Sequence, residues 1–407
     1  MRRTVSMYHC RNMHLLEDPY LRLLGLIALL FFLPKVLLRL GLPSPVTELC
    51  LGALCGPLGM GLVEHSELLQ GLAGIGISAL FLFAGIEVEV PELLLRRRII
   101  LQHLAIQAGL LALATAAGVA GGLSLPVAAL LAAAVMSPSA GFIVPALDTL
   151  GLPPAMASWI KQKAIGTELM AIAAVLVFSN SGSQRDLLIG LGGMLALLLF
   201  LPATFVLFHR AILRWAPRTE FSFVMIVALL AAYVTHHLGV HYLVGAFVVG
   251  LAARRYLDWC SARMVQVAPV RQAIHSFRFF SAFFVPFYFF GVGLLLPVGA
   301  LTPAAFLFAA ALVAMAVPLR IASVAVHRRF GLGEPWRDAL GVGFLLGPTT
   351  VFSLAVAEIL RARFGVADWI FGGIVLYGAA TSLVPLLSRR RVSTEYEDLL
   401  PAAPAPT

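Results

Sequence analysis

Residues 155–179, AMASWIKQKAIGTELMAIAAVLVFS, form an apolar stretch of the length that a helix needs to cross a bilayer. Near its middle lie Thr167 and Glu168, after the two lysines Lys161 and Lys163. A charged side chain at the centre of a membrane helix costs about 2.5–3.5 kcal/mol on insertion scales. Such a carboxylate is expected either to pair with a neighbouring helix or to bind a transported ion or proton. We interpret Glu168 as the centre of the functional site.

The composition of the whole chain agrees with this membrane setting. Of the 407 residues, 60% are hydrophobic and 12% are charged, whereas soluble domains carry about 25% charged residues. Apolar segments of spanning length recur along the chain and predict about thirteen helical spans joined by short loops. These segments cover roughly 21–40, 45–61, 69–87, 99–120, 124–146, 155–179, 187–209, 220–238, 241–257, 279–297, 303–327, 338–361 and 366–387. The sequence thus predicts an all-α polytopic membrane protein.

Other classes of protein find little support in the sequence. The chain has neither a Walker A pattern nor a GxGxxG motif, and its four cysteines lack metal-ligand spacing, so we predict no cofactor. A membrane-embedded enzyme needs a cluster of acid, base or nucleophilic groups. The one candidate cluster is His236, His237 and His241, which has no carboxylate nearby. We therefore expect a protein that is not an enzyme.

The positive charges predict how the chain is oriented. Most of the 29 lysines and arginines fall at span ends and loops on one side of the predicted topology. We expect the protein in the inner (plasma) membrane. The positive-inside rule then places its C-terminus in the cytoplasm. An odd number of spans places the N-terminus outside, against the arginines of the N-terminal segment. We expect a polar tail at 1–20, a membrane domain at 21–388 and a short cytoplasmic tail at 389–407.

Two spans carry a helix break near their middle. The fifth contains Met-Ser-Pro-Ser-Ala-Gly at 136–141, and the twelfth contains Gly-Pro-Thr-Thr at 347–350. Proline removes a helical hydrogen bond, and irregular backbone at membrane depth is tolerated only inside protein or along a wet cavity. Matching breaks in two halves are typical of transporters built from inverted repeats. The breaking residues are Pro138, Gly347 and Pro348, and oxygen ligands for a cation are expected from Glu168, Thr167, Ser137, Ser139, Thr349 and Thr350.

A buried arginine lies one span before the second break. Arg320 sits well inside a span, after Pro318, and Glu168 follows the first break by one span. Two opposite charges at membrane depth lower each other's desolvation cost, so we predict that Arg320 is the charge partner of Glu168. The alternative is that Arg320 extends to the membrane surface along its aliphatic stem. Glu358, beside Arg361 near a span end, is expected at the membrane interface.

Several stretches together resemble a known family. LFLFAGIEVEVPELL at 80–94, MSPSAGFIVPALDTLGL at 136–152, KAIGTELMAI at 163–172 and the later stretches at 243–254 and 283–296 resemble signatures of the monovalent cation:proton antiporter superfamily. These are sodium/hydrogen exchanger domain proteins, and the likeness is strongest to the bacterial branch with potassium-efflux antiporters. It runs in order over roughly 20–388. The resemblance implies crossed discontinuous helices, core helices at about 99–179 and 303–387, and a homodimer.

The chain departs from the family pattern at two places. Thr167-Glu168 stands where the family has Asp-Asp, Asn-Asp or Gln-Asp, and the Gly347 break stands where the potassium-efflux branch tends to have Arg-Gly-Glu-Phe. The expected function is exchange of Na⁺ or K⁺ for protons by alternating access, with one proton per cation and no net charge movement. Alternatives are ion-coupled transport of an organic anion or other solute by the same fold, and a lipid-modifying enzyme.

Overall fold

The computed structural model describes residues 19–64, 66–89, 97–147, 150–179, 184–212, 215–216, 219–237, 242–262 and 267–388. Within these ranges every regular element is a helix, and no strand is present. The predicted all-α fold is thereby confirmed. The expected tails, 1–20 apart from Pro19 and Tyr20, and 389–407, lie outside the described residues.

The described helices are long and apolar enough for a membrane. Seven of them pass as single spans, and the bent pair Trp336–Leu345 and Thr350–Phe364 makes an eighth. Four shorter apolar helices accompany them, at Leu23–Leu38, Ser44–Cys55, Phe221–Thr235 and Phe279–Leu294. The predicted total of about thirteen spans stays a prediction.

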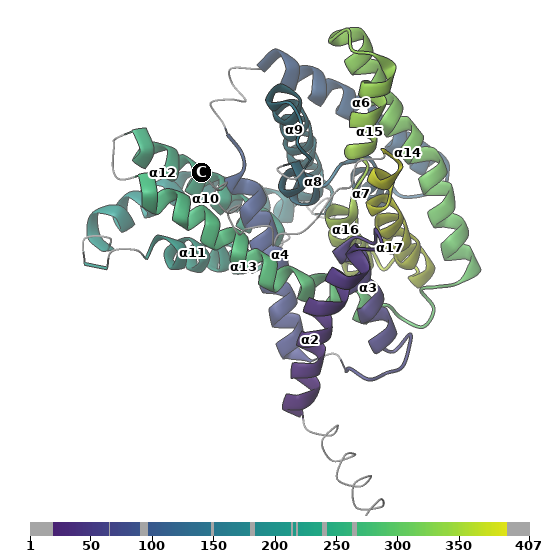
Figure 1. Cartoon of the computed structure of the whole chain (residues 1–407), viewed down its shortest axis with the longest axis horizontal. Coiled ribbons are helices and arrows are strands. Elements are labelled where there is room, and N and C mark those ends of the chain that lie inside the picture. The colour runs from purple at the N-terminus through teal and green to yellow at the C-terminus, as the bar shows by residue number, and fades with distance from the viewer. Residues whose placement is uncertain are drawn as a thin grey trace, which may run out of the picture.

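The helices form two groups that lie side by side (Figure 1). The core group contains α6 (Arg97–Ala120), α7 (Leu125–Met136), α8 (Ala140–Leu147), α9 (Pro154–Ser179), α14 (Pro303–Gly331), α15 (Trp336–Leu345), α16 (Thr350–Phe364) and α17 (Asp368–Ser382). The scaffold group contains α2 (Pro19–Leu38), α3 (Ser44–Cys55), α4 (Glu67–Ile86), α10 (Gln184–Leu207), α11 (Glu220–His237), α12 (Tyr242–Ala262) and α13 (Val267–Leu294). Two short elements follow α10 and α17, η1 (Phe208–Ile212) and η2 (Val384–Ser388).

Burial shows which helices lie at the centre of the core group. In the apolar window of α7 and α8, Leu125–Val144, 89% of the residues are buried inside the protein, against 11% in the window Leu187–Leu207 of α10. A helix that is apolar all round and buried packs against protein, whereas an exposed apolar helix faces lipid. The span with the first break is therefore enclosed by other helices, as irregular backbone at membrane depth requires.

Glycines allow the scaffold helices to pack closely. A Cβ atom at Gly85 of α4 would lie 2.2 Å from the carbonyl oxygen of Phe247 on α12. In the same contact, a Cβ atom at Gly250 would lie 2.1 Å from the carbonyl oxygen of Leu82. Small residues that let two backbones touch are the usual means of packing membrane helices, where apolar surface gains little from leaving lipid. This contact fixes α4 against α12.

Both predicted helix breaks are present, and they touch. In the first, α7 ends at Met136 and α8 begins at Ala140. In the second, α15 ends at Leu345 and α16 begins at Thr350, with a bend of 44°. The backbone N–H of Ser139 donates a hydrogen bond to the carbonyl oxygen of Pro348 at 2.9 Å. The two discontinuous helices therefore cross at their breaks.

Candidate ion-binding site at the crossing of the broken helices

The first break frees the last three carbonyl groups of α7. In a continuous helix each would accept from the N–H four residues later. Pro138 has no N–H, the N–H of Ser139 binds Pro348, and the N–H of Ala140 binds Glu168. Side chains of three other helices donate to these carbonyl groups in place of the missing N–H groups. The pairs are Ala134 with Ser353 of α16 (2.8 Å), Val135 with Tyr377 of α17 (2.6 Å) and Met136 with Gln107 of α6 (3.2 Å).

Glu168 of α9 lies at the N-terminal end of α8, the second half of the first broken helix. Its Oε2 accepts a hydrogen bond from the N–H of Ala140, the first residue of α8, at 2.9 Å. The side chain is 2% exposed, so the carboxylate is almost fully removed from solvent. The free N–H groups and the positive dipole end of a helix stabilise a negative charge placed there. The break thus supplies Glu168 with a partner that carries no full charge.

Two serines flank Pro138 in the first break. Ser137 Oγ accepts a hydrogen bond from Gln107 Nε2 at 3.1 Å. Ser139 is completely buried, and its Oγ forms no hydrogen bond with the part of the chain that the structure describes. Leaving a buried hydroxyl without a partner costs about 1–3 kcal/mol. Ser139 directly precedes Ala140, the residue whose N–H binds Glu168.

Thr167 directs its hydroxyl along its own helix. Thr167 Oγ1 donates toward the carbonyl oxygens of Lys163 (2.8 Å) and Ala164 (3.0 Å). This back-bonding is common for threonine within helices. Thr167 is therefore buried, and its hydroxyl hydrogen forms a hydrogen bond within α9.

Arg320 binds the second break instead of Glu168. Its Nη1 donates to the carbonyl oxygen of Gly347 at 2.9 Å, and its Nη2 donates to that of Leu346 at 2.7 Å. These carbonyls follow the C-terminal end of α15, where a helix is electronegative and favours a cation. The direct ion pair between Arg320 and Glu168 predicted from the sequence is not formed in this structure. The freed carbonyls of the broken helix take up the guanidinium.

The threonines of the second break are held by α17. The N–H of Thr349 donates to Thr381 Oγ1 at 3.2 Å, and the two hydroxyl oxygens lie 3.0 Å apart. Thr350 Oγ1 donates to the carbonyl oxygen of Gly378 at 3.0 Å and also contacts Ser382 Oγ. Both threonines therefore lie at the crossing, with hydrogen bonds that fix α16 to α17.

The two lysines of α9 have different surroundings. Lys161 Nζ lies 2.9 Å from Glu87 Oε2 and 3.0 Å from Glu89 Oε1, at the end of α4. Lys163 is 4% exposed and lines a small void of about 10 Å³ together with Pro138 and Arg320. Lys161 thus joins the core group to the scaffold group, and Lys163 adds a buried cation near the crossing.

Comparison with known proteins places this arrangement in a family. The sequence profile described as the transmembrane part of sodium/hydrogen exchangers matches residues 25–388. The chain belongs to this family. Membership confirms the resemblance seen in the sequence and makes the protein a member of the monovalent cation:proton antiporter superfamily.

Individual relatives carry antiporter names. The Na⁺/H⁺ antiporter NhaS5 of Synechocystis is 27% identical over 92% of this chain and 55% of its own length. The Na⁺/H⁺-K⁺ antiporter GerN of Bacillus cereus is 26% identical over 63% of this chain and 66% of its own length. The chain therefore spans about half the length of the first of these relatives and about two thirds of the second.

A solved structure has the same fold. The sodium proton antiporter MjNhaP1 from Methanocaldococcus jannaschii superposes with a TM-score of 0.64 over 89% of this chain and 93% of its own, at 17% identity. An electron microscopy map of the same protein gives a TM-score of 0.67 at 16% identity. At this identity the likeness establishes the fold.

Four side chains that hold the site were not found by the sequence reasoning. Gln107, Ser353, Tyr377 and Thr381 all bind a break, and Gln107 is 1% exposed. Of these, Gln107 gives a sequence signal, because an amide inside an apolar span needs a partner. The hydroxyl groups give none, since serine, threonine and tyrosine are frequent in membrane helices.

Proposed function

We propose that this chain exchanges a monovalent cation, Na⁺ or K⁺, for protons, and that Glu168 binds both in turn. The observation that carries the proposal is the buried Glu168 carboxylate at the N-terminus of α8, where the two broken helices cross. One carboxylate can hold a proton or a cation, and binding of one releases the other. Family membership and the antiporter names of the relatives support the same conclusion.

The oxygen atoms at the crossing suit an alkali cation. Ser139 Oγ, with no other hydrogen bond to described residues, is the first candidate beside Glu168, followed by Ser137. Hard cations prefer such hydroxyl, carbonyl and carboxylate oxygens. The buried cations near the crossing, Lys163 and Arg320, remain in place, so replacing one proton by one monovalent cation moves no net charge.

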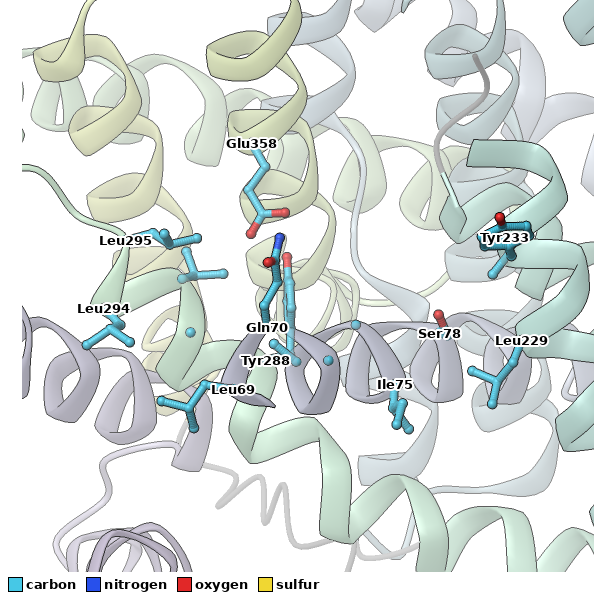
Figure 2. A pocket seen from close by; sticks show the side chains of 16 residues that line it. Leu69, Gln70, Ile75, Ser78, Leu229, Tyr233, Tyr288, Leu294, Leu295 and Glu358 are labelled. Atoms are coloured by element: carbon cyan, nitrogen blue, oxygen red, sulfur yellow. The ribbon is translucent and has the colours of Figure 1, made fainter. Parts of the chain in front are cut away.

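The contacts between the two helix groups support alternating access. Near one end of α4, Glu87 and Glu89 bind Lys161 of the core group. Near the other end, Gln70 and Glu358 line a cavity of about 420 Å³ between the groups (Figure 2). Gln70 and Glu87 are about 25 Å apart along the helix at 1.5 Å per residue. These contacts support a state in which the protein is closed at one end of α4 and accessible at the other.

The proposal includes the membrane and the orientation of the protein. The charge distribution of the sequence supports an inner-membrane protein with a cytoplasmic C-terminus and an outer N-terminus. In that orientation the ion pairs of Lys161 face the cytoplasm and the cavity faces outward. The proposed assembly is a homodimer, and the proposed membrane domain extends over 21–388, as in the family.

The experiment that tests the proposal is Glu168→Gln in proteoliposomes. Gln keeps the size and the hydrogen-bond acceptor of Glu but has no negative charge. It therefore cannot take up a proton or bind a cation as the carboxylate does. We expect the variant to lose proton-coupled Na⁺ and K⁺ movement, while its thermal melt in detergent still shows a folded protein. Glu168→Asp keeps the charge and serves as the matched control, with reduced but measurable exchange.

Competition at one carboxylate also fixes the dependence on pH. Protons occupy Glu168 as pH falls, so the apparent KM for the cation is expected to rise toward acidic pH and to level off toward alkaline pH. Normal exchange by Glu168→Gln contradicts the proposal. The same liposomes loaded with organic anions distinguish cation exchange from transport of another solute by this fold.

A further inference from the structure

An apolar groove runs between α10 and α12 of the scaffold group, which pack side by side (Figure 1). It contains a cavity of about 250 Å³. Leu201, Phe205 and Val248 form its buried floor, whereas Leu198 and Val206 at its rim are 45% and 44% exposed. In the apolar window of α10 only 11% of the residues are buried, so this helix faces lipid. The groove therefore opens toward the hydrocarbon of the membrane.

One end of the groove lies at the level of the membrane surface. Arg255 of α12 lines this end. In the preceding residue, Arg254, Nη2 lies 3.6 Å from Glu89 Oε1 and Nε lies 3.0 Å from Asp258 Oδ1, and Glu89 also binds Lys161. Charged side chains gather where a helix leaves the hydrocarbon, because they are costly within it. Arg255 therefore lies where the headgroups of the lipids begin.

The Arg255 guanidinium has no partner among the described residues. Its side chain is exposed and forms neither an ion pair nor a hydrogen bond with any of them, whereas Arg254 contacts two carboxylates. Among the described residues that line the groove, Arg255 is also the one with a formal charge at neutral pH. A guanidinium presents its donors in a planar fork that fits two oxygens of a phosphate group. This end of the groove is thus complementary to a phosphate ester.

Two aromatic side chains follow Arg255 at the same end. Tyr256 and Trp259 line the groove with ring centroids 6.3 Å apart, and the Phe205 ring lies 5.3 Å from that of Tyr256. Tyrosine and tryptophan concentrate at the interface between hydrocarbon and headgroups. The wall continues to Val248, about 10 Å from Arg255 along the helix at 1.5 Å per residue. The groove thus runs from a cation, past aromatic rings, to aliphatic walls, in the order of the phosphate, the glycerol esters and the acyl chain of a phospholipid.

We propose that this groove binds one anionic phospholipid, whose phosphate contacts Arg255 and whose acyl chain lies between α10 and α12. Charge favours an anionic lipid over a zwitterionic one, because no carboxylate among the described residues lines the groove to receive the ammonium of a choline headgroup. Basic pockets between membrane helices on the cytoplasmic side suit anionic headgroups in general. The proposal needs only the groove and its charge, so it does not depend on the proposed ion exchange.

Lipid binding by the purified protein tests the charge at the site. Wild type and variants in detergent are mixed with phosphatidylglycerol or phosphatidylcholine of identical acyl chains, and bound lipid is counted by native mass spectrometry. Wild type should bind the first phosphatidylglycerol about fivefold more tightly than phosphatidylcholine. Arg255→Gln should lower the affinity for phosphatidylglycerol by about that factor. Arg255→Lys should keep part of the preference, because it retains the charge without the planar fork.

Quenching of tryptophan fluorescence tests the place of the acyl chain. Phosphatidylglycerol with brominated acyl chains quenches the tryptophans that it touches, and Trp259 lines the groove. The part of the quenching that is lost in Trp259→Phe therefore reports this site. At sub-saturating lipid this part should fall about fivefold in Arg255→Gln. It should also fall in Ala252→Phe, which fills the groove from its wall.

A control variant and free phosphate decide between the outcomes. Arg337 of α15 is an exposed arginine that does not line the groove, so Arg337→Gln should leave both measurements unchanged within about twofold. A thermal melt checks that each variant is folded. Equal binding of the two lipids by wild type overturns the proposal, as does an equal loss of affinity in Arg255→Gln and Arg337→Gln. Inorganic phosphate at the concentration of the lipid should not displace the brominated lipid, and displacement would show a site for a free anion instead.

Discussion

Arg320 and Glu168, the two buried charges of the crossing, are held by different partners. Glu168 binds the N–H of Ala140, whereas Arg320 binds the carbonyl groups of Leu346 and Gly347. Residues without shared partners usually have additive effects on stability, within about 0.5 kcal/mol. We therefore expect the losses of Glu168→Gln and Arg320→Met to add in the double variant. This reverses the expectation of partial recovery that a direct ion pair would give.

The measurement is a double-mutant cycle from thermal or denaturant unfolding of the four proteins in detergent. Arg320→Met alone should destabilise the protein, because two carbonyl groups of the second break lose their donors, while Arg320→Lys should restore part of the loss. A coupling free energy above about 1 kcal/mol would show that the two charges interact after all.

At this scale the sequence revealed the buried charges but not their partners. Glu168 and Arg320 stand out because charges are rare at membrane depth. Their opposite charges at membrane depth predict that they pair with each other. The helix ends created by the breaks compete for both side chains, since one offers free N–H groups and the other free carbonyl groups. That competition depends on where the breaks lie in space, which a linear pattern does not contain.

Among the helices, α7 depends on side chains from elsewhere for its final turn. Gln107 of α6 supplies the hydrogen bond of Met136 and also binds Ser137. We expect Gln107→Leu to destabilise the protein by about 1–3 kcal/mol, because it leaves a buried carbonyl without a donor. Gln102→Leu on the exposed face of the same helix is the matched control and should cost less. Equal shifts in melting temperature for the two variants would contradict this role of Gln107.

The positions of the breaks could be predicted, because they follow from local chemistry. Pro138 removes an N–H from α7, and Pro348 and Gly347 interrupt α15, so each break is written in a few consecutive residues. The donors that replace the lost hydrogen bonds come from α6, α16 and α17, far away in the chain. No local pattern identifies such donors, because their role arises only when the helices pack.

For the whole molecule, the contact between Lys161 and the end of α4 is the one we expect to control which side is accessible. Lys161 links the core group to Glu87 and Glu89 of the scaffold group, and its side chain is 20% exposed. Arg254 lies 3.6 Å from the same Glu89 and 3.0 Å from Asp258, but these contacts stay within the scaffold group. Lys161 and Arg254 therefore form a matched pair of cations, of which one joins the two groups.

Removing the joining cation should change the balance between the two access states. A partly exposed ion pair contributes about 0.2–1 kcal/mol, which corresponds to a shift in populations of up to about fivefold. Lys161→Gln is expected to lower the population of the state seen in this structure. A neutral thiol reagent should then react with Gly74→Cys in the cavity between the groups up to about fivefold more slowly. Arg254→Gln should leave the rate unchanged, because it weakens no contact between the groups. Equal slowing by both variants would show that the acidic end of α4 acts through its charge alone and not as a latch between the core and the scaffold.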